Sequence, residues 1–379
     1  MSHQPSSRHR VWFVSGFRSQ PSLDGSQALM KKSPHQRVTM RAIAARAGVS
    51  PATVSLVFNG RDKQLKISDQ TRQRVLEALR EMNYRPDAAA LTLQGQRTRT
   101  IGVLWSLSGY NPIVTMVNSI ALMADRHGYV SVLIDHLCDA KKTAAALDDL
   151  ASRRVDAIVL DAERRLLMEP AVLSRLRDFT AAVVVCNELI DLPCDIIVHR
   201  REPLYEQASQ HLLRTGRRRL AIVMPNRGNH DLKIAAVRRV INEVGVGELI
   251  ELRFPMTYPD VDPISGQERL VQTLETHFRS GVTFDALLCA SDEDAMHCIR
   301  WLRGRQLRVP EDVAVVGAND TLMGRVWDPP LASGARHNQQ LAATIEGLLF
   351  KRLREDGGPP RQAFVDMEFI CRSSAASIE

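Results

Sequence analysis

Residues 38–60, VTMRAIAARAGVSPATVSLVFNG, have the pattern of two short helices joined by a tight turn. Ala44 is small where the two helices must approach, and Gly48, four residues later, suits a turn that needs a positive φ. Ser50 is a good N-cap for the second helix, and Pro51 at its first position lacks only an N–H that the helix does not use. A shared apolar face at helical spacing is supplied by Ile43, Ala47, Val49, Val54 and Val57. The stretch therefore predicts a helix-turn-helix, with an ordinary helical hairpin as the alternative.

A third helix and a short connecting segment follow this stretch. Ser68 is expected to cap a helix that runs to about residue 82, with one apolar face formed by Val75, Leu76, Leu79 and Met82. Asn83-Tyr84-Arg85-Pro86 ends this helix. Residues 88–95, AAALTLQG, favour a helix but are too few to form one alone. They predict a conditional hinge helix that Asp87 can cap, and a plain linker is the alternative.

Positive charge is concentrated at the N-terminal end of the chain. The 379 residues carry a formal charge of +7, but residues 1–99 hold 17 Lys+Arg against 6 Asp+Glu, a net of +11. The remaining 280 residues hold 33 against 37, a net of −4. This asymmetry suits an anionic polymer bound at one end, whereas a solubilising basic tail is the alternative. Residues 1–37 lack periodicity and are expected to be disordered, and Met30 is a second candidate for the start of translation.

From residue 100 onward, apolar runs alternate with helical periodicity. Strands are expected at 101–107, 129–135, 155–160 and 181–186, and helices near 113–127, 140–151 and 170–178. After a break near 194–202, the expected strands are 218–224, 249–254, 284–289 and 312–317, and the expected helices are near 203–214, 231–244, 265–279 and 293–303. Such apolar strands are typical of parallel sheets covered on both faces. Two α/β lobes with a cleft between them are therefore predicted, completed by a helix at 338–354 and a strand at 363–370.

The sequence lacks the motifs of several other classes of protein. No G-x-G-x-x-G follows the first strand, and there is no G-x-x-x-x-G-K-[ST], H-E-x-x-H or G-x-S-x-G. The six cysteines have no metal-site spacing and are interpreted as reduced thiols of a cytoplasmic protein. No run of 18 apolar residues is present, so no membrane span is expected. We therefore predict no cofactor and no bound metal.

The order of these parts resembles the LacI/GalR (lactose-repressor) family of bacterial transcription regulators over about residues 38–374. Besides the helix-turn-helix, the resemblance rests on F-N-G at 58–60, N-Y-R-P at 83–86, R-T-R-T-I-G-V at 97–103, N-P-I at 111–113, A-S-D at 290–292, V-A-V-V-G-A-N-D at 313–320, D-P-P-L at 328–331 and E-F-I-C-R-S-S at 368–374. It implies an α/β fold in which a three-helix headpiece (38–86) and a hinge helix or linker (87–98) precede a two-lobed sensor (99–379) like a periplasmic binding protein. Lobe 1 is expected at about 99–200 and 338–366, and lobe 2 at about 201–337 and 367–379.

The resemblance also implies a function. The chain is expected to be a cytoplasmic, sequence-specific DNA-binding regulator, a repressor and not an enzyme. It is expected to bind a pseudo-palindromic double-stranded operator as a homodimer. No apolar heptads follow the last strand, so a tetramer made by a C-terminal helical bundle is not expected. A small-molecule effector, a sugar or a sugar derivative, would bind between the sensor lobes and change the affinity for the operator.

Individual positions of the headpiece match the DNA contacts of the family. Pro51 and Ala52 hold base-reading positions, and Leu56 holds a third, where many members carry an arginine that reads guanine. Leucine can only touch an apolar edge such as a thymine methyl group. Leu93 matches a leucine that is wedged into the minor groove. Phosphate-contacting positions, which set register but not sequence, are matched by Ser50, Thr53, Ser55 and Asn59. The predicted DNA-binding set is completed by Thr39 and Ala90.

The positions that match effector contacts are Asn111, Lys233, Ser291, Asp292, Asn319, Asp320 and Arg336. Lys233 stands where an arginine is common, Asn319 where an aspartate is common, and Arg336 where a glutamine is common. These replacements make the cleft more positive, because an Asp-to-Asn change removes a negative charge and an arginine replaces a neutral side chain. We hypothesise an effector with an anionic group, such as a sugar phosphate or a sugar acid, and a neutral sugar is the alternative.

Two other classes of protein compete with this interpretation. A solute-binding protein would use the same two-lobed fold, but the helix-turn-helix and the missing secretion signal argue against it. An α/β enzyme with an added helical domain would need a catalytic site, for which Asp292 and Asp320 would be the candidate pair. The missing cofactor motifs argue against that class.

Overall fold

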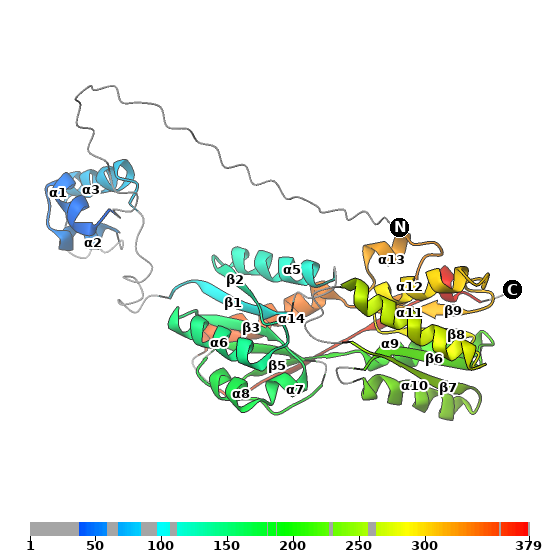
Figure 1. The fold of residues 1–379 in the computed structure, drawn as a ribbon. Helices are drawn as coiled ribbons and strands as arrows, with labels where there is room; N and C mark the ends of the chain where they lie inside the picture. Colours follow the sequence, from blue (N-terminus) through cyan, green and yellow to red (C-terminus); the bar gives the residue numbers. More distant parts are fainter. Residues whose placement is uncertain are drawn as a thin grey trace, which may run out of the picture. The chain divides into compact units, whose positions relative to one another are not determined.

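The computed structural model describes residues 38–58, 67–84, 97–106, 112–179, 181–186, 188–226, 230–256, 263–355 and 358–377 (Figure 1). The chain divides into two compact units, Met1–Asp87 and Ala88–Glu379. The expected disordered extension at 1–37 and residues 87–96 of the hinge expected at 87–98 lie outside the described residues. We describe each unit by itself.

The first unit contains the predicted helix-turn-helix. Its helices are α1 (Met40–Ala47), α2 (Pro51–Phe58) and α3 (Asp69–Glu81). Gly48 ends α1 with a φ of 65°, which confirms the predicted left-handed turn. The Ser50 hydroxyl accepts a hydrogen bond from the Thr53 amide at 3.1 Å, and the Ser68 hydroxyl accepts one from the Thr71 amide at 3.3 Å. Both predicted N-caps are therefore confirmed.

The three helices share one small core. Its buried side chains are Ile43, Ala44, Ala47, Val54, Val57, Val75 and Ala78. Four further side chains predicted for this core pack around its edge and are partly buried: Val49, Leu76, Leu79 and Met82. The apolar face predicted from helical spacing is therefore the face that packs.

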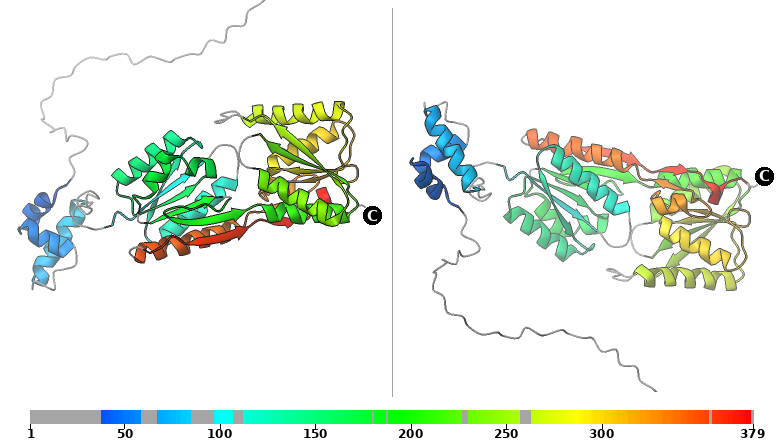
Figure 2. Two further views of the ribbon diagram at one scale, coloured as in Figure 1. Left: turned by 90° about the horizontal axis from the view of Figure 1, so that it is seen from below. Right: turned by 90° about the horizontal axis from the view of Figure 1, so that it is seen from above.

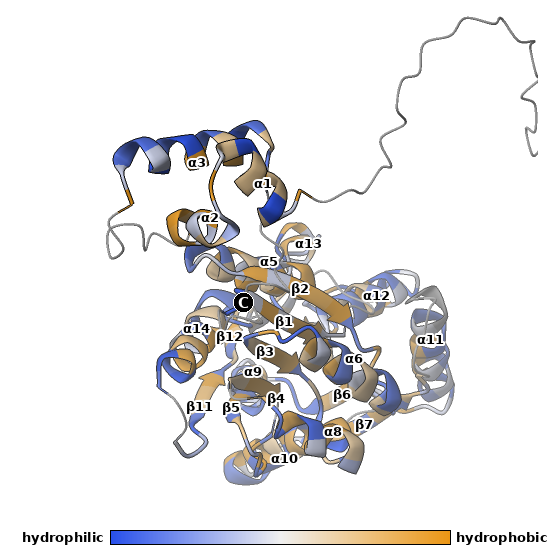
Figure 3. Cartoon of the chain, turned by 90° about the vertical axis from the view of Figure 1, so that its left-hand side faces the viewer, coloured by the Kyte–Doolittle hydropathy of each residue, from blue (hydrophilic) through white to orange (hydrophobic). Residues whose placement is uncertain are grey.

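Lobe 1 of the second unit is built on a parallel sheet with the order β11-β5-β4-β3-β1-β2 (Figure 1). Its strands are β1 (Thr100–Trp105), β2 (Val130–Asp135), β3 (Ala157–Asp161), β4 (Ala182–Cys186), β5 (Asp195–Arg200) and β11 (Gln362–Asp366). One face of the sheet packs on α5 (Pro112–Arg126) and α14 (Asn338–Arg354), and the other on α6 (Ala140–Ser152), α7 (Arg164–Leu167) and α8 (Pro170–Leu176). Figure 3 shows the sheet strands as largely hydrophobic and the helices as mixed, as expected for a doubly covered sheet.

Lobe 2 repeats this plan with a four-stranded parallel sheet in the order β7-β6-β8-β9. Its strands are β6 (Arg219–Pro225), β7 (Glu248–Phe254), β8 (Ala286–Cys289) and β9 (Ala314–Val316). Helices α9 (Glu202–Arg214) and α10 (Asp231–Val244) cover one face, and α11 (Pro263–Arg279) and α12 (Asp292–Arg303) cover the other. The short helix α13 (Leu322–Val326) and a 3₁₀ turn (Ser373–Ala375) complete the lobe. No helix in the described ranges is long and apolar enough to cross a membrane.

Two expectations about the strands are wrong. The break expected near 194–202 contains β5, and a buried aspartate, Asp195, at its start hides an otherwise apolar run. The strand expected at 363–370 is divided at Met367 into β11 and β12 (Glu368–Ile370). Strand β11 pairs with β5 in lobe 1, whereas β12 pairs antiparallel with β10 (Ser333–Ala335). Both errors arise because long-range strand pairing overrides the local pattern.

The two lobes are joined by chain segments that lie side by side. Within the described residues, the chain passes between the lobes after β5, after β10 and after β11. Arg200 at the end of β5 donates two hydrogen bonds to Asp366 at the end of β11, at 2.6 and 2.7 Å. The Met367 amide then donates to the Arg200 carbonyl at 2.9 Å. Figure 2 shows these segments running together between the lobes.

A buried ion pair holds the start of β5. The Asp195 carboxylate is fully buried and accepts hydrogen bonds from the Arg352 guanidinium and from the Arg361 amide, the latter at 2.9 Å. We predict that Arg352→Gln lowers the free energy of unfolding by about 3 kcal/mol, because it leaves a buried carboxylate without its charged partner. Denaturant unfolding of the full chain measures this loss.

Arg175→Gln is the matched control, because Arg175 pairs on the surface of the same lobe with the exposed Asp148. Solvent already screens that pair, so its loss should be small. Equal destabilisation by the two substitutions would contradict the importance of the Arg352–Asp195 pair.

Candidate functional site

The start of α2 presents small exposed side chains to solvent. Pro51 and Ala52 are exposed, and Leu56, four residues after Ala52 and thus on the same side of the helix, is half-buried. The Thr53 hydroxyl lies 2.9 Å from the Ser50 hydroxyl. Thr39 caps α1 in the same manner as Ser50 caps α2, with the Ala42 amide as donor at 3.2 Å. Both α1 and α2 therefore begin with an exposed, hydroxyl-capped N-terminus, and helix N-termini and hydroxyl side chains are groups that contact phosphates.

The structure brings together part of the predicted DNA-binding set. Thr39, Ser50, Thr53 and Ser55 lie on α1, on α2 or at their N-caps with Pro51, Ala52 and Leu56. Asn59, Ala90 and Leu93 lie outside the described residues. The DNA contacts of all these side chains stay predictions.

A cavity of roughly 220 Å³ lies between the two lobes of the second unit. Its walls come from the carboxyl ends of the parallel strands, where α/β folds bind ligands. Lobe 1 contributes Trp105, Ser106, Ile113, Cys138, Asp161 and Glu163. Lobe 2 contributes Pro225, His230, Lys233, Met256, Ala290, Ser291, Asp294 and Asn319, and the connections between the lobes contribute Arg201 and Arg336.

Three cations line this cavity. Lys233 is 4% exposed, and its Nζ lies 3.0 Å from Nδ1 of His230. Burial, aided by the nearby Arg201, lowers the pKa of Lys233 to about 7. Burial, again with Arg201, lowers the pKa of Arg336 to about 10, and Arg336 donates a long hydrogen bond to Asn319 at 3.4 Å. Within the described ranges, none of the three cations forms an ion pair with a carboxylate.

Carboxyl groups line the cavity as well. Burial raises the pKa of Asp161, and the charges of Arg336 and Arg201 oppose this rise. Burial also raises the pKa of Asp294 to about 6. Glu163 lies with Asp161 on the lobe 1 wall. The cavity therefore offers cationic donors and carboxylate acceptors to one ligand.

Two of the predicted effector residues, Asp292 and Asp320, lie outside the lining of this cavity. Asp292 is fully buried, and its carboxylate accepts hydrogen bonds from the Thr321 amide at 2.6 Å, from the Thr321 hydroxyl at 2.8 Å and from the Ser333 hydroxyl. Asp320 pairs with Arg325 at 2.6 Å and with Arg372 at 2.5 Å. Both aspartates are thus engaged within lobe 2. Asn111 lies outside the described residues.

These hydrogen bonds fix a strained loop that carries Asn319. Asn319 has a φ of 118° and Asp320 a φ of 51°, values that are costly for side chains other than glycine. The Asn319 amide donates to the Gly334 carbonyl at 3.0 Å, and the Asp320 amide donates to the Ser333 hydroxyl at 3.0 Å. Asp292 also binds Ser333, so its place in the structure is to hold this loop, with Asn319 at the cavity wall.

Sequence reasoning placed Lys233, Ser291, Asn319 and Arg336 in the cleft, and the structure places them in the cavity lining. Effector contact by these residues stays a prediction. The sequence did not predict five other charged residues of the lining, namely Asp161, Glu163, Arg201, His230 and Asp294. Asp161 and Glu163 directly follow the apolar run of β3, so the rule that ligands bind at the carboxyl ends of strands signals them.

The two units match two family profiles. Residues 39–87 match "Bacterial regulatory proteins, lacI family", and residues 209–375 match "Periplasmic binding protein-like domain". The HTH-type transcriptional repressor PurR of Haemophilus influenzae is 26% identical over 349 residues, which are 90% of this chain and 99% of that protein. The HTH-type transcriptional regulator RegA of Clostridium saccharobutylicum is 26% identical over 342 residues, 89% of this chain and 98% of its own length.

Solved structures share the fold. A lac repressor dimer bound to operator and the anti-inducer ONPF has a TM-score of 0.74 and 22% sequence identity, covering 90% of this chain and 99% of its own. The complex of the transcriptional regulator CelR with cellobiose has a TM-score of 0.62 and 23% identity, covering 89% of this chain and 100% of its own.

The arrangement of a helix-turn-helix unit before a two-lobed, periplasmic-binding-protein-like unit is thus the arrangement of these relatives. The chain belongs to the LacI family and is a DNA-binding transcription regulator, not an enzyme.

Proposed function

We propose that this regulator is a repressor whose affinity for its operator is set by a small molecule bound between the sensor lobes. The observation that carries the proposal is the charged interlobe cavity in a chain that also has a DNA-binding headpiece. A ligand that touches both walls binds one relative position of the lobes better than another, and it shifts the equilibrium by that difference in affinity. Residues 87–98, between headpiece and sensor, would transmit the shift to the DNA.

The headpiece would bind one half-site of a pseudo-palindromic operator. Pro51, Ala52 and Leu56 would face base edges in the major groove, and the hydroxyls at the helix starts would contact phosphates. Leu56 would touch an apolar edge such as a thymine methyl group rather than guanine. Ala90 and Leu93 would lie in the minor groove at the operator centre.

A homodimer would present two headpieces to the two half-sites. Exposed apolar side chains of the sensor support such an assembly. In lobe 1 they lie on α5 and on the edge strand β2, which pack together: Val114, Leu122, Val130 and Leu133. In lobe 2 they lie on α13: Leu322, Met323 and Val326. A second copy of the chain would cover these surfaces and the open edge of the sheet.

The cavity lining favours an effector with an anionic group and several hydroxyls, such as a sugar phosphate or a sugar acid. Arg201, Lys233 and Arg336 would bind the anion, and none of them has a carboxylate partner within the described part of the chain. Asp161 and Asp294 would accept hydrogen bonds from hydroxyl groups. A neutral sugar would give Arg201, Lys233 and Arg336 no anionic partner.

We predict that an anionic effector binds more tightly at low pH. As the pH falls through about 7, Lys233 gains its proton, and below about 6 Asp294 loses its negative charge. Both changes make the cavity more positive. Isothermal titration with sugar phosphates, sugar acids and neutral sugars at pH values between about 5 and about 8 tests this expectation.

Lys233→Met should lower the affinity for an anionic ligand by about tenfold or more, and it should reduce the change of that affinity with pH near neutrality. Lys142→Met, on the exposed surface of α6, is the matched control and should change neither. Binding of neutral sugars alone, or an affinity that does not vary with pH, would overturn the anionic assignment.

We also predict that Leu93→Ala weakens operator binding strongly, because the alanine cannot hold the minor groove open. Leu91→Ala, two residues earlier in the same segment, should have a much smaller effect. Fluorescence anisotropy with an operator duplex at fixed salt measures the operator affinity of both variants. Isothermal titration with the same set of sugars checks that effector binding is unchanged. An unaltered operator affinity of Leu93→Ala would argue against the hinge assignment.

A further inference from the structure

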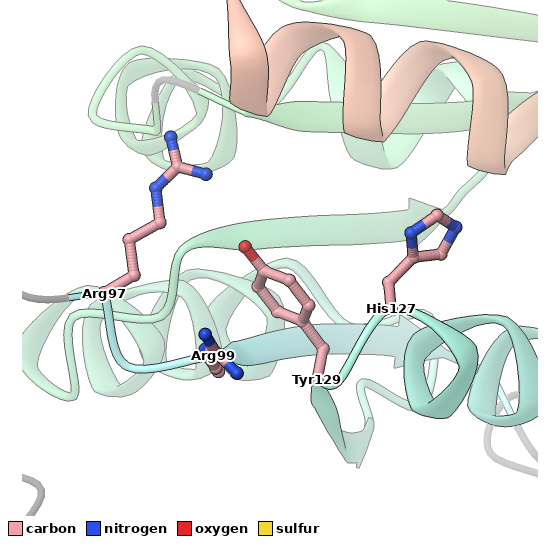
Figure 4. A pocket seen from close by; sticks show the side chains of 4 residues that line it. All are labelled: Arg97, Arg99, His127 and Tyr129. Atoms are coloured by element: carbon pink, nitrogen blue, oxygen red, sulfur yellow. The ribbon is translucent and has the colours of Figure 1, made fainter. Parts of the chain in front are cut away.

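A second charged pocket lies in lobe 1, away from the interlobe cavity. It has a volume of roughly 410 Å³ and is lined by Arg97, Arg99, His127 and Tyr129 (Figure 4). These residues precede β1 and β2, so the pocket lies at the amino ends of the two strands. The interlobe cavity lies at the carboxyl end of β1, beyond Trp105. The two sites are therefore at opposite ends of the same sheet.

The backbone that carries the two arginines is fixed in a strained conformation. Arg99 has a φ of 50°, which is unfavourable for a long side chain. The Asp156 carboxylate holds it, accepting the Thr98 amide at 3.2 Å and the Arg99 amide at 2.7 Å. The Thr98 hydroxyl donates to the Arg154 carbonyl at 2.9 Å, and the Val130 amide donates to the Arg99 carbonyl at 2.8 Å. These hydrogen bonds fix the backbone from which the Arg97 and Arg99 side chains extend.

The donors of this pocket are left largely unused. Arg97 donates to the Leu353 carbonyl at the end of α14, which uses one of its guanidinium nitrogens. Within the described ranges, the Arg99 guanidinium and the Tyr129 hydroxyl have no hydrogen-bond partner, and neither arginine forms an ion pair. Figure 4 shows the Tyr129 hydroxyl on the side of the two arginines, with His127 at the other end of the pocket.

The nearby carboxylates are engaged elsewhere. Glu346 on α14 binds His127 at 2.6 Å and Arg126 at 2.8 Å, and the His127 ring also stacks on Phe350 with ring centroids 3.8 Å apart. Asp156 is occupied by the two backbone amides that fix Arg99. Among the residues that the structure describes, no carboxylate is bound at the arginine end of the pocket, which therefore presents positive charge.

We propose that this pocket binds a phosphate-type oxyanion, with Arg99, Arg97 and the Tyr129 hydroxyl as donors. Planar guanidinium groups match the oxygen geometry of phosphate, and a tyrosine hydroxyl supplies a neutral donor beside them. The oxyanion is either a free phosphate or phosphate monoester, or a phosphate of the DNA backbone. The chemistry of the contacts is the same in the two cases.

Isothermal titration of the full-length protein with inorganic phosphate, without DNA, tests the free ligand. We expect saturable binding that Arg99→Gln weakens by about tenfold or more and that Tyr129→Phe weakens less. Arg153→Gln is the matched control, because Arg153 lies on the same lobe but is already bonded to Asp149 at 2.7 Å. The same titration in a Lys233→Met background, which lacks one cation of the interlobe cavity, separates the two sites, because binding that remains there and is lost when Arg99→Gln is added belongs to this pocket.

The salt dependence of binding to duplex DNA tests the second source. If the pocket holds a backbone phosphate, Arg99→Gln reduces the slope of log affinity against log salt by about 0.9 for each phosphate that the variant no longer neutralises. Arg153→Gln should leave the slope unchanged. Far-UV circular dichroism and thermal unfolding confirm that each variant is folded.

If Arg99→Gln loses phosphate binding, the pocket binds free phosphate, as proposed. If free phosphate does not bind but Arg99→Gln reduces the slope of log DNA affinity against log salt, the pocket binds a phosphate of DNA. Folded Arg99→Gln and Arg153→Gln proteins that agree in both phosphate affinity and salt slope would overturn it.

Discussion

The sensor depends on the pairing of strands where the chain passes between its lobes. Strand β11 lies beside β5, and β12 lies beside β10, so the connecting segments run together. The Arg200–Asp366 hydrogen bonds fasten two of these segments at the boundary. Arg201 and Arg336 lie in these connections and line the interlobe cavity. A ligand that neutralises them therefore acts on the same segments that set the relative position of the lobes.

The cavity contains ionisable groups with shifted pKa values and a loop with a strained backbone. Burial lowers the pKa values of the cations Lys233 and Arg336, and it raises the pKa values of the acids Asp161 and Asp294. Each group is thus held in an environment that disfavours its charged form. The strained loop at Asn319 and Asp320 is kept in place by Asp292 and Ser333. Pre-ordered donors and acceptors of this kind lower the cost of ordering on binding.

Local signals in the sequence predicted the headpiece well, because its caps, turn and apolar face are all determined within a few residues. Gly48, Ser50 and Ser68 lie where their chemistry requires. The alternating apolar runs also predicted both sheets. Strand β5 was missed because the polar Asp195 at its start interrupts the apolar pattern, and the strand at 363–370 was expected to be continuous because its two halves pair with different strands, β5 in lobe 1 and β10 in lobe 2. Asp292 was expected at the ligand, whereas only the fold reveals Ser333 and Thr321 as its partners.

The most direct test of the central claim is to sequence the genomic fragments that the purified full-length protein retains at a fixed, near-physiological salt concentration. The salt must be fixed because phosphate contacts make the affinity steeply salt-dependent. An effector-controlled repressor should enrich a few fragments that share a pseudo-palindromic site. Uniform recovery of fragments, governed by their length alone, would contradict sequence-specific recognition by this headpiece.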